Sequence, residues 1–384
     1  MAKKIMVIAG EASGDLHAGK VVCAIRKISP DIEVFGVGGE RMKKCGAELI
    51  YDISKSKISF IGFIDVVKNL KKISEFKNRC VETLLERKPD AVLLVDYPGF
   101  NLMFAKFAKQ NGFKVFYYIA PQVWAWGRGR IKDLRNYVDK LFVIFKFEED
   151  FFKKFGVDAE FVGHPLLEDL KDIESARDED FFDKYGIERK QIISFFPGSR
   201  LQEIKAMLGT MLNAGKMLKE KFDVEIVFSK AKTISELDIK RIIGDEISNF
   251  KFVDDSHLLL RFSKVAVVKS GTTSLEAGIL GVPMVVCYKT SLLNFLIGKM
   301  LIKTDVIESI SLPNIVLGKK LVPELIQNHF TEEKIFEEVS NLLVDERRYE
   351  NLRAELLQIK DILSLKCREK STSEIVAEKI ISSL

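Results

Sequence analysis

The sequence predicts an α/β fold with two similar domains, each built on a parallel sheet wound with helices. Short apolar runs alternate with longer amphipathic runs, which is the pattern of strands joined by crossover helices. The alternation is interrupted by the charged stretch EDLKDIESARDEDFFDKYGIERK at 168–190 and then starts again. A chain of 384 residues is long enough for two domains with a core each.

The apolar runs place strands in both halves of the chain. In the first half they predict strands at Lys4–Ala9, Glu33–Val37, Ala91–Asp96, Lys114–Ile119, Lys140–Phe145 and Ala159–Val162. In the second half they predict strands at Gln191–Phe196, Glu225–Ser229, Lys251–Val253, Val265–Lys269 and Met284–Tyr288. We therefore expect Rossmann-like domains at 1–165 and 166–360 that face a cleft, and a C-terminal helix at 361–384 that could pack back on the first domain.

Composition and charge argue against several classes of protein. The 60 basic and 55 acidic side chains leave a net charge of +5, which is too weak a bias to indicate a nucleic-acid partner.

The five cysteines are far apart and form no Cys-x-x-Cys pair, so we infer a reducing compartment and no protein-bound metal. No apolar run approaches the roughly 20 residues of a spanning helix, and the N-terminus lacks the apolar core of a signal peptide. We expect a cytoplasmic protein that meets membranes only peripherally.

The stretch at 265–278, VAVVKSGTTSLEAG, predicts a phosphate-binding turn between a buried strand and a helix. Ser270, Gly271, Thr272 and Thr273 offer hydroxyls and a backbone without bulky side chains where unpaired helix N–H groups point outward. Glu276, about one turn into the helix, could accept hydrogen bonds from the vicinal hydroxyls of a ribose. The alternative is a plain capping box with Thr273 as the N-cap. The stretch alone leaves both interpretations open.

Asp96 ends the predicted strand AVLLVD, at the edge of a parallel sheet where ligands of such folds bind. A carboxylate in that position is a candidate general base, because burial and neighbouring groups can tune its pKa. The alternative is a local turn in which Asp96 bonds backbone N–H groups before a helix capped by Asn101.

Three further loops follow predicted strands. The first, Gly10-Glu11-Ala12-Ser13-Gly14-Asp15, is not a Gly-x-Gly-x-x-Gly dinucleotide motif and could be only a tight turn. The second, around Gly198 and Ser199, could offer N–H groups while Arg200 binds a pyrophosphate. The third, APQVWAW at 120–126, holds both tryptophans and is followed by two arginines, which suits a sugar or a phosphorylated amphiphile or else packing at a domain boundary.

Two apolar segments have basic flanks. SFIGFIDVV at 59–67 is followed by lysines, and LLNFLIGKMLI at 292–302 lies between Lys289 and Lys303. We expect the first to meet acyl chains or a bilayer surface through Phe60, Ile61 and Phe63, although a core helix is an equally simple interpretation.

Taken together, the loops resemble one family more closely than any single loop does. AGEASGD, VDYPGFN, APQVWAW, FVGHPLL, PGSRLQEI, SGTTSLEA, PMVVCYK and SLPNIV occur in the order and spacing typical of lipid-A-disaccharide synthases, from about Lys4 to Gln327. The resemblance implies a GT-B glycosyltransferase that needs no metal or cofactor. It implies an inverting reaction between UDP-2,3-diacylglucosamine and 2,3-diacylglucosamine 1-phosphate (lipid X), at the inner face of the cytoplasmic membrane, by a chain that could form a homodimer.

The resemblance also implies roles for individual residues. Asp96 matches the base and acts alone, because this chain has Gly99 where some relatives carry a second acid. The positions that match donor-binding residues are Gly198, Ser199, Arg200, Glu203, Ser270, Gly271, Thr272, Thr273, Glu276 and Asn314. The positions that match the acceptor side are Glu11, Ser13, Gly14, Gln122, Trp126, Arg128 and Arg130.

Two other functions fit the same architecture. A sugar-nucleotide 2-epimerase would need several acid and base groups around one sugar, whereas the first half offers one clear candidate. A nucleotide-sugar-binding module without activity would not need a base at Asp96. Release of UDP only in the presence of an acylated acceptor would separate the three functions.

Overall fold

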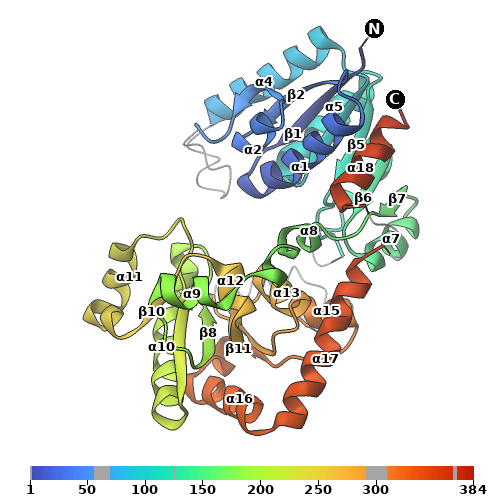
Figure 1. Ribbon diagram of the computed structural model, residues 1–384. Coiled ribbons are helices and arrows are strands. Elements are labelled where there is room, and N and C mark those ends of the chain that lie inside the picture. The colour runs from blue at the N-terminus through green and yellow to red at the C-terminus, as the bar shows by residue number, and fades with distance from the viewer. Residues whose placement is uncertain (1, 56–69, 125–126, 291–308, 366–369) are drawn as a thin grey trace. The chain divides into compact units, whose positions relative to one another are not determined.

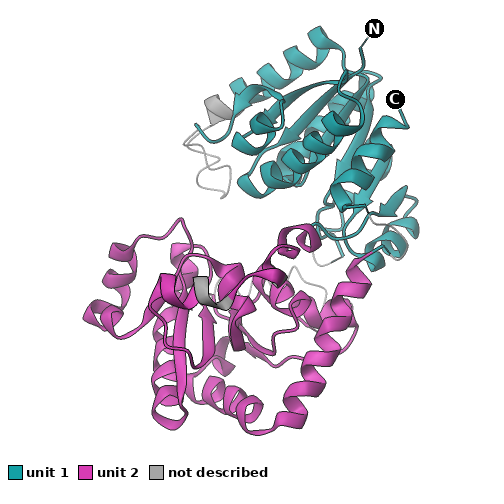
Figure 2. Ribbon diagram, in the orientation of Figure 1, with its two compact units in different colours: residues 1–165, 365–384 teal, residues 166–364 magenta. Residues whose placement is uncertain are grey.

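The computed structural model describes residues 2–55, 70–124, 127–290, 309–365 and 370–384. The chain divides into two compact units, Met1–Pro165 with Leu365–Leu384, and Leu166–Ser364 (Figure 2). Each unit contains one sheet of parallel strands with helices along it, so the predicted α/β class with two wound sheets is confirmed.

The sheet of unit 1 has the strand order β3-β2-β1-β4-β5-β6-β7. Its strands are β1 (Lys4–Ala9), β2 (Glu33–Gly38), β3 (Glu48–Asp52), β4 (Ala91–Val95), β5 (Lys114–Tyr118), β6 (Lys140–Val143) and β7 (Ala159–Phe161). Its helices are α1 (Ala12–Ile28), α2 (Glu40–Lys44), α4 (Leu70–Arg87), α5 (Pro98–Gln110), α6 (Arg130–Tyr137), α7 (Lys146–Lys153) and α18 (Thr372–Ile381).

Both faces of this sheet are buried, which explains why its strands are continuous apolar runs. Ile5 and Val7 of β1 belong to a core that includes side chains of α1 and α18. Met6 and Ile8 belong to a second core that includes side chains of α4 and α5. Successive side chains of a strand point to opposite faces, so a strand covered on both sides must be apolar at every position.

The C-terminal helix α18 packs against α1 within unit 1 (Figure 1). Lys27 of α1 lies 3.0 Å from the Glu374 carboxylate, and Lys379 forms an ion pair with Glu160 of β7. Ile375 and Ile380 are buried in the core beneath the helix. The end of the chain therefore completes the first unit, although it follows the second unit in sequence.

The sheet of unit 2 has the order β10-β9-β8-β11-β12-β13. Its strands are β8 (Gln191–Phe196), β9 (Val224–Ser229), β10 (Lys251–Val253), β11 (Ser263–Lys269), β12 (Met284–Tyr288) and β13 (Glu324–Ile326). Its helices are α8 (Leu166–Leu170), α9 (Asp178–Tyr185), α10 (Leu201–Lys221), α11 (Glu236–Ile243), α12 (Ser256–Arg261), α13 (Thr272–Ile279), α15 (Leu312–Leu317), α16 (Glu332–Val344) and α17 (Glu346–Leu363). Short 3-10 helices lie at Ile173–Ser175, Gly244–Asn249 and Gln327–His329.

Every predicted strand is present, with ends that differ by up to two residues. The prediction missed β3 and β13, which are the edge strands next to β2 and β12. β3 is mostly half-exposed and β13 has three residues, so neither forms the long apolar run that marks a central strand.

The cysteines differ from the sequence-based expectation. Cys23 of α1 and Cys45, directly after α2, form a disulfide with their Cα atoms 4.8 Å apart, which does not fit the inferred reducing compartment. The two residues are 22 positions apart, and their proximity arises because α2 packs against α1. Cys80 and Cys287 are buried free thiols, and burial raises the pKa of the Cys80 thiol to about 12.

Both predicted apolar segments, including Phe60, Ile61 and Phe63, lie outside the described residues. Within the part of the chain that the structure describes, no helix is both long enough and apolar enough to cross a membrane.

Candidate functional sites of the two units

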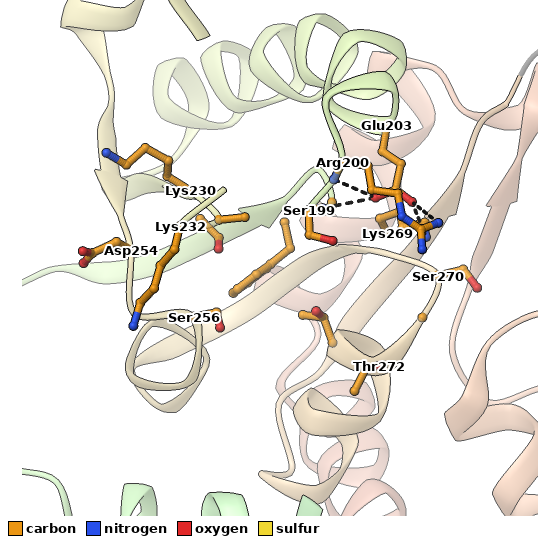
Figure 3. A pocket seen from close by; sticks show the side chains of 16 residues that line it. Ser199, Arg200, Glu203, Lys230, Lys232, Asp254, Ser256, Lys269, Ser270 and Thr272 are labelled. Carbon is orange, nitrogen blue, oxygen red and sulfur yellow. Dashed lines mark hydrogen bonds and ion pairs between the residues drawn. The ribbon is translucent and has the colours of Figure 1, made fainter. Parts of the chain in front are cut away.

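Unit 2 has a cavity of about 490 Å³ at the carboxyl ends of β8, β9 and β11 (Figure 3). Of the predicted donor-binding residues, it brings together Gly198, Ser199, Arg200, Glu203, Ser270, Gly271, Thr272 and Thr273. These come from two loops that are about 70 residues apart in sequence. They meet because β8 and β11 are neighbours in the sheet.

The turn after β11 has an open helix N-terminus. Gly271 is the N-cap of α13, no side chain caps the helix, and Thr272 and Thr273 are its first residues. The predicted alternative of a capping box with Thr273 as the N-cap is therefore wrong. The Ser270 hydroxyl donates to the Ile310 carbonyl at 2.9 Å, which holds the turn in place. First-turn N–H groups and the positive end of a helix favour an anion here.

The turn after β8 is shaped by Glu203. Gly198 has φ +115°, and a Cβ atom there would lie 2.5 Å from Glu203 Oε2, so this position requires glycine. The same Oε2 atom accepts hydrogen bonds from the N–H groups of Ser199 at 3.1 Å and Arg200 at 3.3 Å. The expectation that the Ser199 N–H is open to a phosphate is corrected by this bond. The Glu203 carboxylate instead stabilises the loop from which the Arg200 side chain extends.

The cavity carries more positive charge than the sequence motifs predict. Lys230, Lys232 and Lys269 line it together with Arg200, and the acids among the lining residues are Glu203 and Asp254. Lys269 Nζ lies 3.0 Å from Glu203 Oε1. Burial raises the pKa of Glu203, but the Lys269 charge and the backbone hydrogen bonds outweigh it and leave the pKa below its ordinary value.

None of the three lysines was predicted from the sequence, although two of them lie at positions that carry a signal. Lys269 is the last residue of the buried strand β11, and Lys230 directly follows β9. A charged residue at the carboxyl end of an apolar parallel strand faces the edge where ligands of such sheets bind.

Two predicted donor-binding residues lie away from the cavity lining. Glu276 is buried and its Oε1 lies 3.3 Å from His257 Nε2, an interaction that raises the pKa of His257. The Asn314 amide donates to Val322 O and Glu324 Oε1, while its oxygen accepts from the N–H groups of Leu321 and Val322. Asn314 is thus engaged on both sides within unit 2, where it holds the segment before β13.

The carboxyl edge of the unit 1 sheet is conformationally strained. Asp96 (φ +50°) and Tyr97 (φ +48°) follow β4, and Ile119 (φ +64°) follows the neighbouring strand β5. Residues other than glycine seldom adopt these angles, and such strain is concentrated at functional sites. Asp96 therefore lies beyond the strand, in a backbone conformation that differs from the predicted extended one.

Hydrogen bonds hold Asp96 in this conformation. Its carbonyl oxygen accepts from the Tyr117 hydroxyl at 2.6 Å and from Asn101 Nδ2 at 2.7 Å, and its N–H donates to Tyr118 O at 3.0 Å. Asn101 is fully buried inside α5, whose N-cap is Tyr97, so the alternative in which Asn101 caps this helix is wrong. The contributions of Tyr117 and Asn101 were not visible in the sequence, because they depend on contacts across strands.

Burial raises the pKa of the Asp96 carboxyl above its ordinary value. Within the described part of the chain, no cation forms an ion pair with this carboxylate. A carboxylate without a cationic partner and with a raised pKa is a stronger proton acceptor than a paired one.

The other predicted residues of unit 1 that the structure describes follow β1 or β5 in the chain. A Cβ atom on Gly10 would lie 2.3 Å from the Tyr97 ring, which places the loop after β1 directly beside the loop that carries Asp96. Glu11 is the N-cap of α1, and Ser13 and Gly14 lie in its first turn. Gln122 and Arg128 are exposed and Arg130 begins α6, whereas Trp126 lies outside the described residues.

The other tryptophan of the motif is structural. Trp124 is buried within unit 1, and its Nε1 donates to the buried Glu148 carboxylate at 2.9 Å. Burial raises the pKa of Glu148 to about 7 even though Trp124 and two backbone N–H groups bond it. Packing inside unit 1 thus accounts for Trp124. The alternative from the sequence was also packing, but at a domain boundary.

Comparisons with solved structures support the fold. The chain is similar to UDP-GlcNAc 2-epimerase from Neisseria meningitidis, solved bound to UDP-GlcNAc, with a TM-score of 0.65 and 13% identity over 99% of this chain and 100% of that one. It is also similar to the glycotransferase of kitacinnamycin, with a TM-score of 0.63 and 14% identity over the whole of both chains. At these identities the likeness concerns the GT-B-like fold alone.

Comparisons of sequence are more specific. The family model for lipid-A-disaccharide synthetase matches residues 5–380. A lipid-A-disaccharide synthase of Syntrophus aciditrophicus is 39% identical over 366 residues, which cover 94% of each chain. One of Geobacter sulfurreducens is 34% identical over 379 residues, which cover 98% of this chain and 97% of that one. The match extends over both units and both candidate sites, and the chain therefore belongs to the lipid-A-disaccharide synthase family of glycosyltransferases.

Proposed function

We propose that the chain transfers 2,3-diacylglucosamine from its UDP derivative to the 6-hydroxyl of 2,3-diacylglucosamine 1-phosphate. The products are a β-1,6-linked disaccharide 1-phosphate and UDP. The observation that carries the proposal, beyond family membership, is the cationic cavity of unit 2, where Arg200 and the open N-terminus of α13 lie at the carboxyl edge of a parallel sheet.

In this proposal unit 2 binds the donor. Arg200 and the first turn of α13 bind the diphosphate, and their positive charge stabilises UDP as it departs. Glu276 lies deeper along α13, where its carboxylate could accept hydrogen bonds from ribose hydroxyls if the pair with His257 rearranges. Asn314 contributes by supporting the neighbouring segment.

Unit 1 activates the acceptor. The Asp96 carboxylate removes the proton from the 6-hydroxyl of the acceptor, and the oxygen attacks the anomeric carbon of the donor from the side opposite UDP. The bond from that carbon to the diphosphate oxygen breaks, and its electron pair leaves with UDP. A single displacement of this kind inverts the anomeric carbon and needs no covalent intermediate on the enzyme.

Both proposed substrates carry acyl chains, so we further propose that the chain works at the inner face of the cytoplasmic membrane. An amphiphilic substrate is presented at a bilayer surface, and basic side chains near anionic lipids favour reversible docking. Sedimentation with anionic vesicles tests this part separately. A homodimer stays a prediction from the family resemblance.

The decisive experiment measures UDP release from the UDP-linked donor with and without lipid X, together with the mass of the product. We expect release only when the acylated acceptor is present, with formation of the disaccharide 1-phosphate. An isomerised UDP-sugar without UDP release would support the epimerase alternative. Binding of the donor without any conversion would support a binding module.

A further inference from the structure

Lys269 lies directly before the phosphate turn, and no sequence motif accounts for its charge. It ends β11, and the four residues before it, at 265–268, are fully buried. Its side chain is 24% exposed and lines the cavity (Figure 3). A Cβ atom placed on Gly271 would lie 3.9 Å from Lys269 Nζ, so the ammonium group lies beside the backbone of the turn.

The charges around Lys269 are not balanced inside the protein. Glu203 Oε1 lies 3.0 Å from Lys269 Nζ and 3.9 Å from Arg200 Nη1. One carboxylate thus serves two cations, and its other oxygen is occupied by two backbone N–H groups. The positive end of α13 adds to the excess, because the helix begins three residues after Lys269. A ligand with two or more negative charges would complete this arrangement.

We propose that Lys269 is a second cationic ligand of the donor diphosphate, and that Glu203 positions its ammonium group. The inference rests on the proposed function, since it takes a UDP-sugar as the donor. Lys269 and Arg200 extend from the ends of neighbouring strand–turn units and both line the cavity beside Glu203, so the diphosphate would be bound by one cation from each loop. Glu203 acts through the two cations and the loop N–H groups, which makes it a positioning residue for both.

The competing explanation is an ion pair that only fastens the loop after β8 to the end of β11. The two explanations differ in which ligands respond to loss of the Lys269 charge. A structural pair would affect UDP, UMP and uridine alike, through the shape of the cavity. A diphosphate ligand would affect UDP most, UMP less and uridine not at all.

The test is calorimetric titration of Lys269→Gln with UDP, UMP and uridine. We expect UDP to bind roughly 10- to 100-fold more weakly, UMP to lose less affinity, and uridine to be unaffected. Lys264→Gln is the matched control, because Lys264 is on the same strand but outside the cavity lining, where it contacts Glu346 at 3.5 Å and the Tyr349 ring. The control should bind all three ligands as the unaltered chain does.

A second measurement avoids substitution altogether. Lysines of the unaltered chain are acetylated with and without ligand, and the modified positions are quantified by mass spectrometry. UDP should protect Lys269 but not Lys264, and uridine should protect neither. Equal protection of Lys269 by uridine and UDP, or unchanged UDP affinity in Lys269→Gln, would overturn the inference. If the unaltered chain binds neither UDP nor the UDP-linked donor, the proposed function itself fails.

Discussion

The two sheets share the same order over their first six strands, and β7 is an additional strand of unit 1, yet their carboxyl edges differ in chemistry. In both units the first strand lies between the second and the fourth, so β1 and β4 of unit 1 correspond to β8 and β11 of unit 2. Asp96 follows β4 in the place where Ser270 follows β11, and the Gly10 loop corresponds to the Gly198 loop. The same scaffold thus presents two sets of side chains at equivalent positions.

The edges also obtain their backbone shapes differently. In the two loops that line the unit 2 cavity the unusual angles belong to glycines, Gly198 and Gly271, which adopt them at little cost. In unit 1 they belong to Asp96, Tyr97 and Ile119, where a Cβ atom makes them unfavourable by roughly 1–3 kcal/mol each. A glycine lets the backbone approach a ligand closely, whereas the strained backbone at Asp96 sets the direction of its carboxylate side chain.

The electrostatic contrast is equally clear. In unit 2 the cations Lys269 and Arg200 lie beside Glu203, and the pKa of Glu203 is below its ordinary value. Burial dominates at Asp96, and its pKa is high. One edge therefore suits an anionic ligand and the other suits proton transfer, although nothing in the topology distinguishes them.

The largest expected effect is loss of the base. Asp96→Asn should lower kcat by a hundredfold or more, the usual contribution of general-base catalysis, and leave UDP affinity unchanged. Asp90→Asn is the matched control, because Asp90 precedes the other end of β4 and bonds the Lys4 N–H at 2.8 Å. Steady-state kinetics and UDP titration check both variants. Normal turnover in Asp96→Asn would remove the catalytic distinction between the two edges.

The next effect concerns the anion-binding edge. Arg200→Ala should weaken UDP binding by roughly 10-fold or more and should also lower kcat, since its charge interacts with the diphosphate before and during departure. The Arg200 side chain is 69% exposed, so the free energy of unfolding should change little. Calorimetry with UDP is the measurement. Unchanged affinity would reassign Arg200 to its contact with Glu203.

Much of this contrast could be predicted from the sequence, because it depends on local patterns. Apolar runs located the strands, and the residues after them identified Asp96, Arg200 and the turn at Ser270. The roles of Tyr117 and Asn101 could not be predicted, because they bond the Asp96 carbonyl from another strand and from within a helix. Local reasoning identifies side chains that face an edge but not the contacts that hold them.

The same limit explains why two predicted donor-binding residues have their polar atoms engaged within the protein. Glu203 and Asn314 were assigned by their matching positions, which carry no information about neighbours. Lys269 takes one Glu203 oxygen and the loop N–H groups take the other, while the segment before β13 occupies the Asn314 amide. Such competition for polar atoms appears only when the chain is folded.

A smaller effect is expected in the dependence of stability on pH. The Glu276 partner raises the pKa of His257, with Asp169 and Asp255 adding to it. A raised histidine pKa stabilises the folded state fully below the ordinary pKa of 6.5, and the contribution is lost as the pH rises through the folded-state pKa. Replacing His257 by glutamine should therefore cost about 1 kcal/mol or less near pH 6 and less near pH 9. Urea unfolding at both pH values measures it, and a pH-independent difference would contradict the ion pair.

The smallest effect is expected at Gly99, the position after Pro98 at the start of α5. A Cβ atom there would have no described neighbour within 4 Å, and the backbone angle is not among the positive ones. Gly99→Ala should raise the free energy of unfolding by a few tenths to about 1 kcal/mol, because alanine loses less backbone entropy in a helix. Turnover should stay within about twofold of the unaltered chain, because the added methyl group contacts no described residue. Gly271→Ala is the contrasting variant from unit 2, where φ is +149° and strain should lower both stability and UDP affinity. If Gly99→Ala folds normally but loses turnover, the acceptor fills the open space at Gly99. The unit 1 edge would then require glycine for a close approach to its ligand, just as the unit 2 edge does.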